Sequence, residues 1–214
     1  DINSINIKNL NFKFKEPEII NVFNNFNIEL KKGDALFISG QSGRGKSTLL
    51  NILSGFTEID SGNVYINKNI DIKNLKSFGK QHISYSSQNI FLTRGSIKDN
   101  ITMFDGEVDE EKLEKVIDIS CCKEFLIKKN IDLDYLIEDF GKNFSGGEKQ
   151  RIQLARSLYF NKQIMFFDES TSAMELELEQ KFLQNLSSLS KNKIIVFVSH
   201  RKINKNFFNK ELKL

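Results

Sequence analysis

The sequence predicts an α/β fold in which a mostly parallel sheet carries helices on both faces. Short apolar runs at 35–39, 164–167 and 194–198 have the length of strands, and helical patterns lie between them. Continuous apolar runs are typical of strands buried on both faces, and strands that alternate with helices form parallel sheets. We expect one domain over residues 1–214, because a chain of this length suits a single core.

The N-terminal part differs, because residues 1–35 alternate apolar and polar positions. Period-two patterns rich in Ile and Phe predict strands with one buried face. The apolar positions are Ile5, Ile7, Leu10, Phe12, Phe14, Phe26, Ile28 and Leu30. A turn at 31–34 then leads into the buried strand at 35–39.

Residues 89–142 are predicted as a mainly helical insertion. Leu113, Val116 and Ile117 follow helical spacing, and Asp109 fits an N-cap. A second helix is expected around 121–129. The α/β pattern resumes with helices at 147–159 and 175–189 around the strands at 164–167 and 194–198. The single domain therefore divides into a core of residues 1–88 and 143–214 and the insertion.

Composition excludes several classes of protein. The net charge of +3 is too weak to argue for a nucleic-acid partner. No run of 18 apolar residues occurs, as a membrane-spanning helix would need. Cys121 and Cys122 are adjacent, which disfavours a disulfide between them and fits a reducing compartment.

A glycine-rich loop follows the strand at 35–39 and precedes a helix expected at 47–53. It matches the phosphate-binding pattern G-x-x-x-x-G-K-[ST] in Gly40, Gln41, Ser42, Gly43, Arg44, Gly45, Lys46, Ser47 and Thr48. Backbone N–H groups and the helix N-terminus of such a loop hold phosphate oxygens. We expect Lys46 to reach the β- and γ-phosphates of ATP, and the Ser47 hydroxyl to bind Mg²⁺.

Two acidic residues directly follow the strand at 164–167. Asp168 and Glu169 are expected at the carboxyl edge of the sheet, where folds of this class bind ligands. There Asp168 would hold Mg²⁺ through water, and Glu169 would polarise an attacking water. Alone, such a pair more often marks a solvated acidic turn, but the phosphate loop upstream favours a nucleotide site.

Residues 144–151, Phe-Ser-Gly-Gly-Glu-Lys-Gln-Arg, resemble the signature motif of ABC-type ATPases, usually written LSGGQ. The resemblance implies a P-loop NTPase (RecA-like) core with an N-terminal antiparallel β-subdomain and a helical insertion. It implies ATP and Mg²⁺ as cofactors. It also implies that Ser145, Gly146 and Gly147 bind the ATP held by a second nucleotide-binding domain, in a homo- or heterodimer.

Further residues match the family in order along the chain. Gln88 matches the glutamine that senses Mg²⁺ and the lytic water, and His200 matches the histidine that contacts the γ-phosphate. Phe14 lies where the family has an aromatic that stacks on adenine, with a core side chain as the alternative. The resemblance therefore implies a catalytic set and a Mg²⁺ set. The first is Glu169, His200, Gln88 and Lys46, and the second is Ser47, Gln88 and Asp168.

The chain departs from the family pattern in three places. The signature has Phe144 for Leu and Glu148 for Gln. Residues 172–175 read Ser-Ala-Met-Glu where the family reads Ser-Ala-Leu-Asp, so Glu175 puts coupling between the two sites of a dimer in question. Few residues follow His200, so the usual C-terminal strands are expected to be abbreviated.

Residues 88–101 resemble the export-type members of the family, and Asp139 fills the place of an exporter loop's usual Glu. The resemblance implies ATP-driven dimerisation that powers export of a substrate across a membrane. The domain would then lie at the cytoplasmic face, in a bacterial inner membrane. Exporters carry a transmembrane domain first in the same chain, and a start without Met fits an excised C-terminal domain.

Other classes of ABC protein remain as alternatives. Soluble ATPases of DNA maintenance carry long coiled coils, but heptads are not sustained between Ser47 and Ser145. Those of translation carry two such domains per chain, and one is present. An importer-type ATPase subunit is a further alternative. A nucleotide-binding regulator without turnover is disfavoured by Glu169, since a general base is present.

Overall fold

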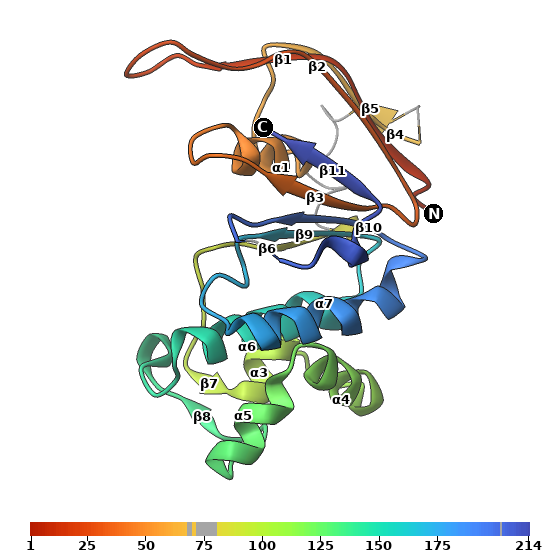
Figure 1. Ribbon diagram of the computed structural model, residues 1–214. Coiled ribbons are helices and arrows are strands. Elements are labelled where there is room, and N and C mark those ends of the chain that lie inside the picture. The colour runs from red at the N-terminus through yellow and green to blue at the C-terminus, as the bar shows by residue number, and fades with distance from the viewer. Residues whose placement is uncertain (68–69, 72–80, 202) are drawn as a thin grey trace.

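The computed structural model describes residues 1–67, 70–71, 81–201 and 203–214. Its elements stack in tiers, as Figure 1 shows. An antiparallel sheet lies at one end, a parallel sheet crosses the middle with helices on both faces, and further helices lie at the opposite end. The α/β class with a parallel sheet and an antiparallel β part is thereby confirmed.

The parallel sheet has five strands in the order β11-β3-β10-β9-β6. They are β3 (Ala35–Ser39), β6 (Ile83–Ser86), β9 (Ile164–Asp168), β10 (Ile194–Val198) and β11 (Lys210–Lys213). Every residue of β9 and β10 is buried, as their continuous apolar sequences require. β11 pairs with β3, so one edge strand follows His200. A 3-10 turn at Lys205–Phe207 precedes it.

The antiparallel sheet has the order β2-β1-β4-β5. Its strands are β1 (Ser4–Phe14), β2 (Ile20–Lys31), β4 (Ser61–Ile66) and β5 (Ile70–Asp71). Ile5, Ile7 and Leu10 are buried and belong to one apolar core with residues of β3 and α1 (Lys46–Leu53). The alternating pattern therefore encodes a sheet with one buried face, as predicted.

A second core lies on the other face of the parallel sheet. It joins α6 (Gly146–Tyr159) and α7 (Leu176–Ser190) to the sheet through Phe167, Phe182 and Phe197. Side chains alternate between the two faces of a strand, so Phe166 belongs to the first core and Phe167 to the second. The phosphate loop and the signature segment are thus supported from opposite faces of one sheet.

The stretch predicted as mainly helical holds α3 (Ile97–Thr102), α4 (Glu110–Ile119) and α5 (Cys122–Lys129). It also holds the short strands β7 (Gly95–Ser96) and β8 (Leu136–Ile137) and a 3-10 turn at Asp139–Gly141. Asp109 caps α4 by accepting from the Lys112 N–H. Cys121 and Cys122 are buried free thiols. Within the described ranges, no helix has the length and apolar content needed to cross a bilayer.

Candidate nucleotide site

The phosphate loop connects β3 to α1, and its lysine lies inside the loop. Lys46 is only 5% exposed, and its Nζ donates to the carbonyls of Gly40 at 3.1 Å and Gln41 at 2.7 Å. Burial lowers the pKa of Lys46, while the charges of Glu169 and Asp168 act in the opposite direction. The Lys46 ammonium group therefore interacts electrostatically with both acidic residues that the sequence assigned to the site.

Gly43 and Gly45 give the loop its shape. Gly45, the N-cap of α1, has φ of 91°, and a Cβ there would lie 2.3 Å from Val22 Cγ1. Gly43 has φ of 78°, and a Cβ there would meet nothing within 4 Å. L-residues disfavour positive φ, so glycine suits both positions. The loop is packed against β2 at Gly45 and open at Gly43, where phosphate oxygens would approach.

Asp168 ends β9 at the carboxyl edge of the sheet, with 5% of its surface exposed. Its Oδ2 accepts a hydrogen bond from the Tyr85 hydroxyl at 2.9 Å. Its Oδ1 is buried and has no hydrogen-bond partner among the described residues. Burial, and then the charge of Asp168, raises the pKa of Tyr85 above its usual range, so the phenol stays a neutral donor.

The unpartnered Asp168 oxygen fits a magnesium site. In the part of the chain that the structure describes, no three His, Cys, Asp or Glu side chains gather as a metal cluster. Mg²⁺ in nucleotide sites takes one or two carboxylates and completes its shell with phosphate oxygens, hydroxyls and water. Asp168 Oδ1 and the Ser47 hydroxyl, at the start of α1, are oxygen donors of the required kind.

Glu169 and His200 form a close pair. Glu169 Oε1 lies 2.8 Å from His200 Nε2. The Glu169 backbone has φ of 50°, an unusual conformation for glutamate, and its N–H donates to the Val198 carbonyl at 3.0 Å. The backbone thus turns the carboxylate out of β9 toward the loop that follows β10. The pair forms at the edge where the strand order predicts ligands.

Gln88 is exposed in the loop after β6, and α6 holds that loop in place. Gln153 Nε2 donates to the Ser87 carbonyl at 2.7 Å, and Gln153 Oε1 accepts from the Phe91 N–H at 3.3 Å. Sequence reasoning missed Gln153. The sequence did offer one indication of its role, since Gln153 is a polar residue at a position where helical spacing predicts burial.

The signature segment is the N-terminus of α6. The Ser145 hydroxyl accepts from the Glu148 N–H at 3.3 Å, and Glu148 Oε2 accepts from the Ser145 N–H at 2.8 Å. Burial raises the pKa of Glu148, but hydrogen bonds from Lys129 and Ser145 outweigh it and lower the pKa. Glu and Gln both close such a capping box, which explains why Glu148 is tolerated here. Ser145 and Gly146 are exposed.

Residues 172–175 pack directly on this helix start. Gln150 Nε2 donates to Ser172 Oγ at 3.0 Å, and the Ala173 N–H donates to Gln150 Oε1 at 2.7 Å. A Cβ on Gly147 would lie 2.8 Å from the Ala173 carbonyl oxygen, so the approach requires glycine. A groove of about 330 Å³ runs between the two segments, with Glu175 on its wall.

Arg201 ties residues 172–174 to the loop that carries His200. Its Nη1 donates to the Met174 carbonyl at 2.7 Å and lies 3.4 Å from Glu179 Oε2, and its Nη2 donates to the Ser172 carbonyl. Glu179 is fully buried on α7 and also accepts from the Thr171 hydroxyl. Sequence reasoning did not find this cluster, since nothing in the spacing links positions 179 and 201.

Phe14 lies at the end of β1 and is 44% exposed, so it is not the core side chain that was its alternative. Its ring packs edge-on against Phe12, with centroids 5.1 Å apart. Phe12 pairs with Phe23 across the strands, and Phe23 borders Gly45. Phe14 therefore lies on the strand pair that adjoins the phosphate loop, and its side chain is partly exposed.

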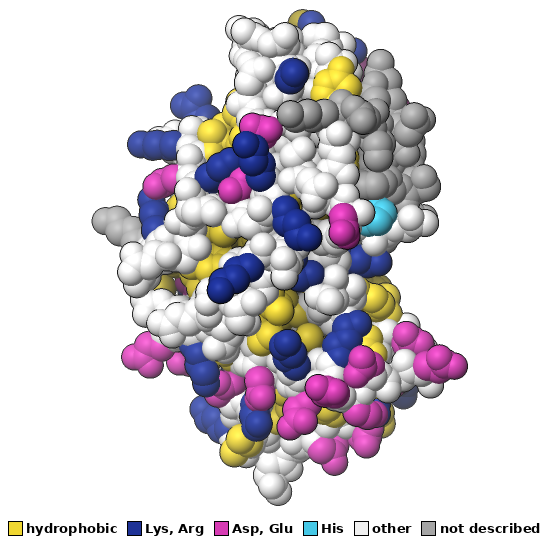
Figure 2. All heavy atoms as spheres, turned by 90° about the vertical axis from the view of Figure 1, so that its right-hand side faces the viewer, with side chains coloured by type: hydrophobic (Ala, Val, Ile, Leu, Met, Phe, Trp, Pro, Cys, Tyr) yellow, Lys and Arg dark blue, Asp and Glu magenta, His cyan; other side chains and the backbone are white. Residues whose placement is uncertain are grey.

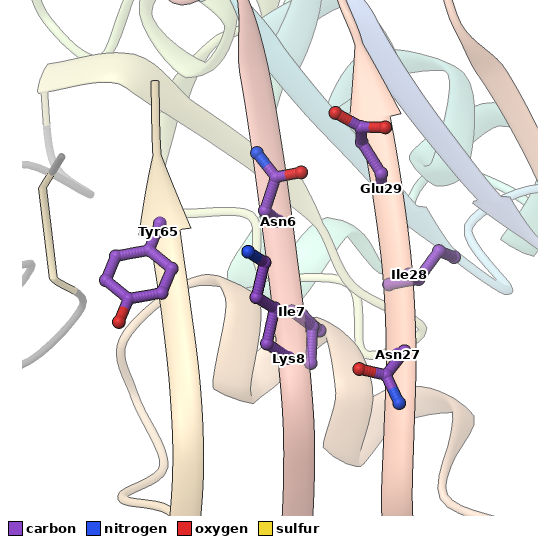
Figure 3. Close-up of a pocket in the computed structure, with 7 residues that line it drawn as sticks. All are labelled: Asn6, Ile7, Lys8, Asn27, Ile28, Glu29 and Tyr65. Atoms are coloured by element: carbon purple, nitrogen blue, oxygen red, sulfur yellow. The ribbon is translucent and has the colours of Figure 1, made fainter. Parts of the chain in front are cut away.

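Neither the signature segment nor a large surface hollow is joined to the phosphate loop within the part of the chain that the structure describes. Among the described residues, no hydrogen bond or ion pair joins Ser145, Gly146 or Gly147 to the phosphate loop. One hollow, of about 770 Å³, lies on the outer face of the antiparallel sheet. Figure 3 shows that it is formed by strand side chains such as Lys8, Glu29 and Tyr65, which are not residues of the predicted site.

Comparisons with known proteins place the chain in a family. The profile of the ABC transporter family matches residues 23–172. A protein of Rickettsia felis, named for an export ATP-binding/permease role, is 33% identical over 199 residues. The match covers 92% of this chain and 34% of that protein. An ATP-dependent lipid A-core flippase of Vibrio vulnificus is 29% identical over 202 residues, with the same coverage of each chain.

The relatives are longer than this chain. A leukotoxin translocation ATP-binding protein of Mannheimia glucosida is 30% identical, and the match covers 92% of this chain and 28% of that one. The chain thus spans about a third of the length of the curated relatives it matches.

A solved structure shares the fold over the whole chain. It is a bacterial Atm1-family ABC exporter with ATP bound, with a TM-score of 0.89 at 24% identity. The match covers 100% of this chain and 37% of that one. Because the family profile spans most of the sequence and the fold agrees, the chain belongs to the ABC transporter family and has the fold of its ATP-binding domain.

Proposed function

We propose that this domain binds ATP with Mg²⁺, closes with a second ATP-binding domain, and hydrolyses ATP to power export of a substrate across a membrane. The observation that carries the proposal is the Glu169–His200 pair, at 2.8 Å, beside a phosphate loop whose Lys46 feels the charge of Glu169. A carboxylate placed near the terminal phosphate position suits activation of water for hydrolysis.

Each side chain has a distinct part in the reaction. Glu169 orients the attacking water and takes its proton, and the water oxygen bonds to the γ-phosphorus as the bond to the β-phosphate oxygen breaks. His200 fixes the Glu169 carboxylate by donating its Nε2–H to Glu169 Oε1. Lys46 and the loop N–H groups bind the β- and γ-phosphates. When bound, Mg²⁺ supplies positive charge against the phosphate oxygens, and Asp168 and Ser47 would hold it.

The second half of each site comes from a partner domain. Ser145 and Gly146 are exposed at the N-terminus of α6, a helix of 14 residues. Such a helix start carries free N–H groups and about half a positive charge, so it attracts phosphate. We propose a head-to-tail dimer in which this segment contacts the ATP on the other copy's loop. ATP then joins the two domains, and hydrolysis separates them.

Exposed aromatic residues on the helical part support docking to a membrane domain. Phe91, Phe104 and Phe140 are 59%, 53% and 76% exposed. Large exposed apolar side chains are candidates for interaction surfaces, and these three belong to one stretch of the chain, residues 89–142. We propose that this surface receives a transmembrane domain encoded earlier in the same full-length protein, at the cytoplasmic face of a bacterial inner membrane. The export names of the relatives support this assignment.

The alternatives from DNA maintenance and translation receive little support. On the face shown in Figure 2, Lys and Arg side chains are spread among other types, and Asp and Glu gather over the helical end. α4 and α5 contain 10 and 8 residues, far from a coiled coil. An importer-type subunit would use the same nucleotide chemistry, and the export names of the relatives favour the exporter.

The change Glu169→Gln tests the proposal. It keeps the shape of the side chain but removes the base, so we expect ATPase turnover to fall about 100-fold or more while ATP binding persists. An ATP-bound dimer should then accumulate in sedimentation experiments. Glu177→Gln, an exposed acid on α7, is the matched control. Undiminished turnover in Glu169→Gln would refute the role of Glu169.

A further inference from the structure

The two oxygens of the Asp168 carboxylate differ in their hydrogen bonding. Its Oδ2 accepts the Tyr85 hydroxyl at 2.9 Å, and its Oδ1 is buried without a partner among the described residues. Tyr85 reaches it from β6, which pairs in parallel with β9 and places Tyr85 opposite Phe166. A hydrogen bond to one oxygen restricts rotation of the carboxylate and leaves the other oxygen free for a ligand.

The Tyr85 ring is itself held by aromatic contacts. It packs edge-on against Phe166, with ring centroids 6.3 Å apart and an interplanar angle of 89°. On another side it contacts Phe56, at 6.4 Å between centroids. These contacts limit rotation of the ring, so the hydroxyl is presented at a defined position. The hydrogen bond to Asp168 therefore costs little additional side-chain entropy.

We propose that Tyr85 is a positioning residue for the magnesium site. Its hydroxyl holds Asp168 Oδ2, so that Oδ1 stays directed and available for Mg²⁺ or for water bound to Mg²⁺. The inference rests on the proposed function, because it assumes that Asp168 serves the metal. Groups that orient metal-binding side chains from the second shell typically change metal affinity about 10- to 100-fold when removed.

The change Tyr85→Phe tests this, because it keeps the ring and removes the hydroxyl alone. Binding of a fluorescent ATP analogue is followed while Mg²⁺ is titrated, and again in EDTA. We expect the apparent Kd for Mg²⁺ to rise about tenfold, with nucleotide affinity in EDTA unchanged. Tyr65→Phe, on β4 and away from the site, is the matched control and should behave as wild type.

The outcomes separate this inference from the proposed function. If the wild type shows no Mg²⁺-dependent nucleotide binding, the proposed function itself fails. If the wild type shows it and Tyr85→Phe has the same Mg²⁺ affinity or a tighter one, the positioning role is overturned. An equal loss of nucleotide binding with and without Mg²⁺ would mean a structural role, and would also overturn it.

A double-mutant comparison removes dependence on overall stability. In an Asp168→Ala background, the Tyr85 hydroxyl has no side-chain oxygen at position 168 to hold. We therefore expect Tyr85→Phe to leave the remaining Mg²⁺ affinity unchanged there. A further tenfold loss in that background would show that the hydroxyl acts on another group, contrary to the proposal.

Discussion

At the scale of single residues, Gly45 is subject to two constraints that both favour glycine, one on its backbone and one on the space around it. Its φ of 91° disfavours any side chain, and a Cβ would collide with Val22 Cγ1 at 2.3 Å. Val22 is only partly buried on β2, so it can yield somewhat. The contact means that the phosphate loop is shaped by the antiparallel sheet as well as by its own sequence.

Gly45→Ala is therefore expected to destabilise the protein by about 1–3 kcal/mol, from backbone strain and overpacking. It should also weaken ATP binding, because the displaced loop no longer directs its N–H groups at the phosphates. Urea unfolding and nucleotide titration measure the two effects. Gly106→Ala, where a Cβ meets nothing within 4 Å, should change stability by less than about 0.5 kcal/mol. If the two variants were equally stable, the backbone at Gly45 would not be strained by a side chain.

A site residue can be predicted from sequence when its position is tied to a recognisable pattern nearby in the chain. Lys46, Asp168 and Glu169 were predictable because each sits at a fixed offset from a buried strand. Tyr85 and Arg201 were not, because their partners lie on elements distant in sequence and no periodic pattern marks them. The burial of Gln153 can be read from helical spacing, but its hydrogen-bond partners cannot.

At the scale of elements, α7 and the loop after β10 are joined through a buried charge. Glu179 is fully buried, and its partners are the Arg201 guanidinium and the Thr171 hydroxyl. Arg201 in turn spans the carbonyls of Ser172 and Met174. The segment that faces the groove beside α6 is thus fixed to the segment that holds His200.

Arg201→Met should destabilise the protein by about 3 kcal/mol, since it leaves the Glu179 carboxylate buried without a cation. Arg201→Met combined with Glu179→Gln removes that charge, so part of the loss should be recovered. Urea unfolding of the wild type, both single variants and the double variant gives the coupling between the two residues. Strictly additive losses would mean that the pair does not interact.

The predicted elements matched the structure where the apolar pattern was continuous or had helical spacing. The strands at 35–39 and 194–198 have the predicted bounds, and α6 and α7 begin within one residue of prediction. The β7–β8 pairing and the capping box of α3 were not predicted. Two-residue strands leave no periodicity to detect, and Ser96 and Asp99 stand in a segment without a long apolar face.

At the scale of the whole molecule, the dimer depends on an exposed helix start. Ser145→Arg places a long cation where the partner's ATP would approach α6. We expect ATP binding to the phosphate loop to persist, and ATP-dependent dimerisation in the Glu169→Gln background to be lost. Sedimentation with and without ATP measures both states. Ser188→Arg, an exposed position on α7, should still dimerise. Dimerisation of Ser145→Arg would count against the shared site.

The placement of the phosphate loop and the signature segment on opposite faces of one sheet has a genetic consequence. In the proposed dimer, each pocket combines the phosphate loop of one copy with the signature segment of the other. Suppose that one copy carries a mutation in its phosphate loop and the other copy a mutation in its signature segment. Both mutations then fall in the same pocket. The remaining pocket is then sound, so two alleles that each fail alone would complement one another when expressed together.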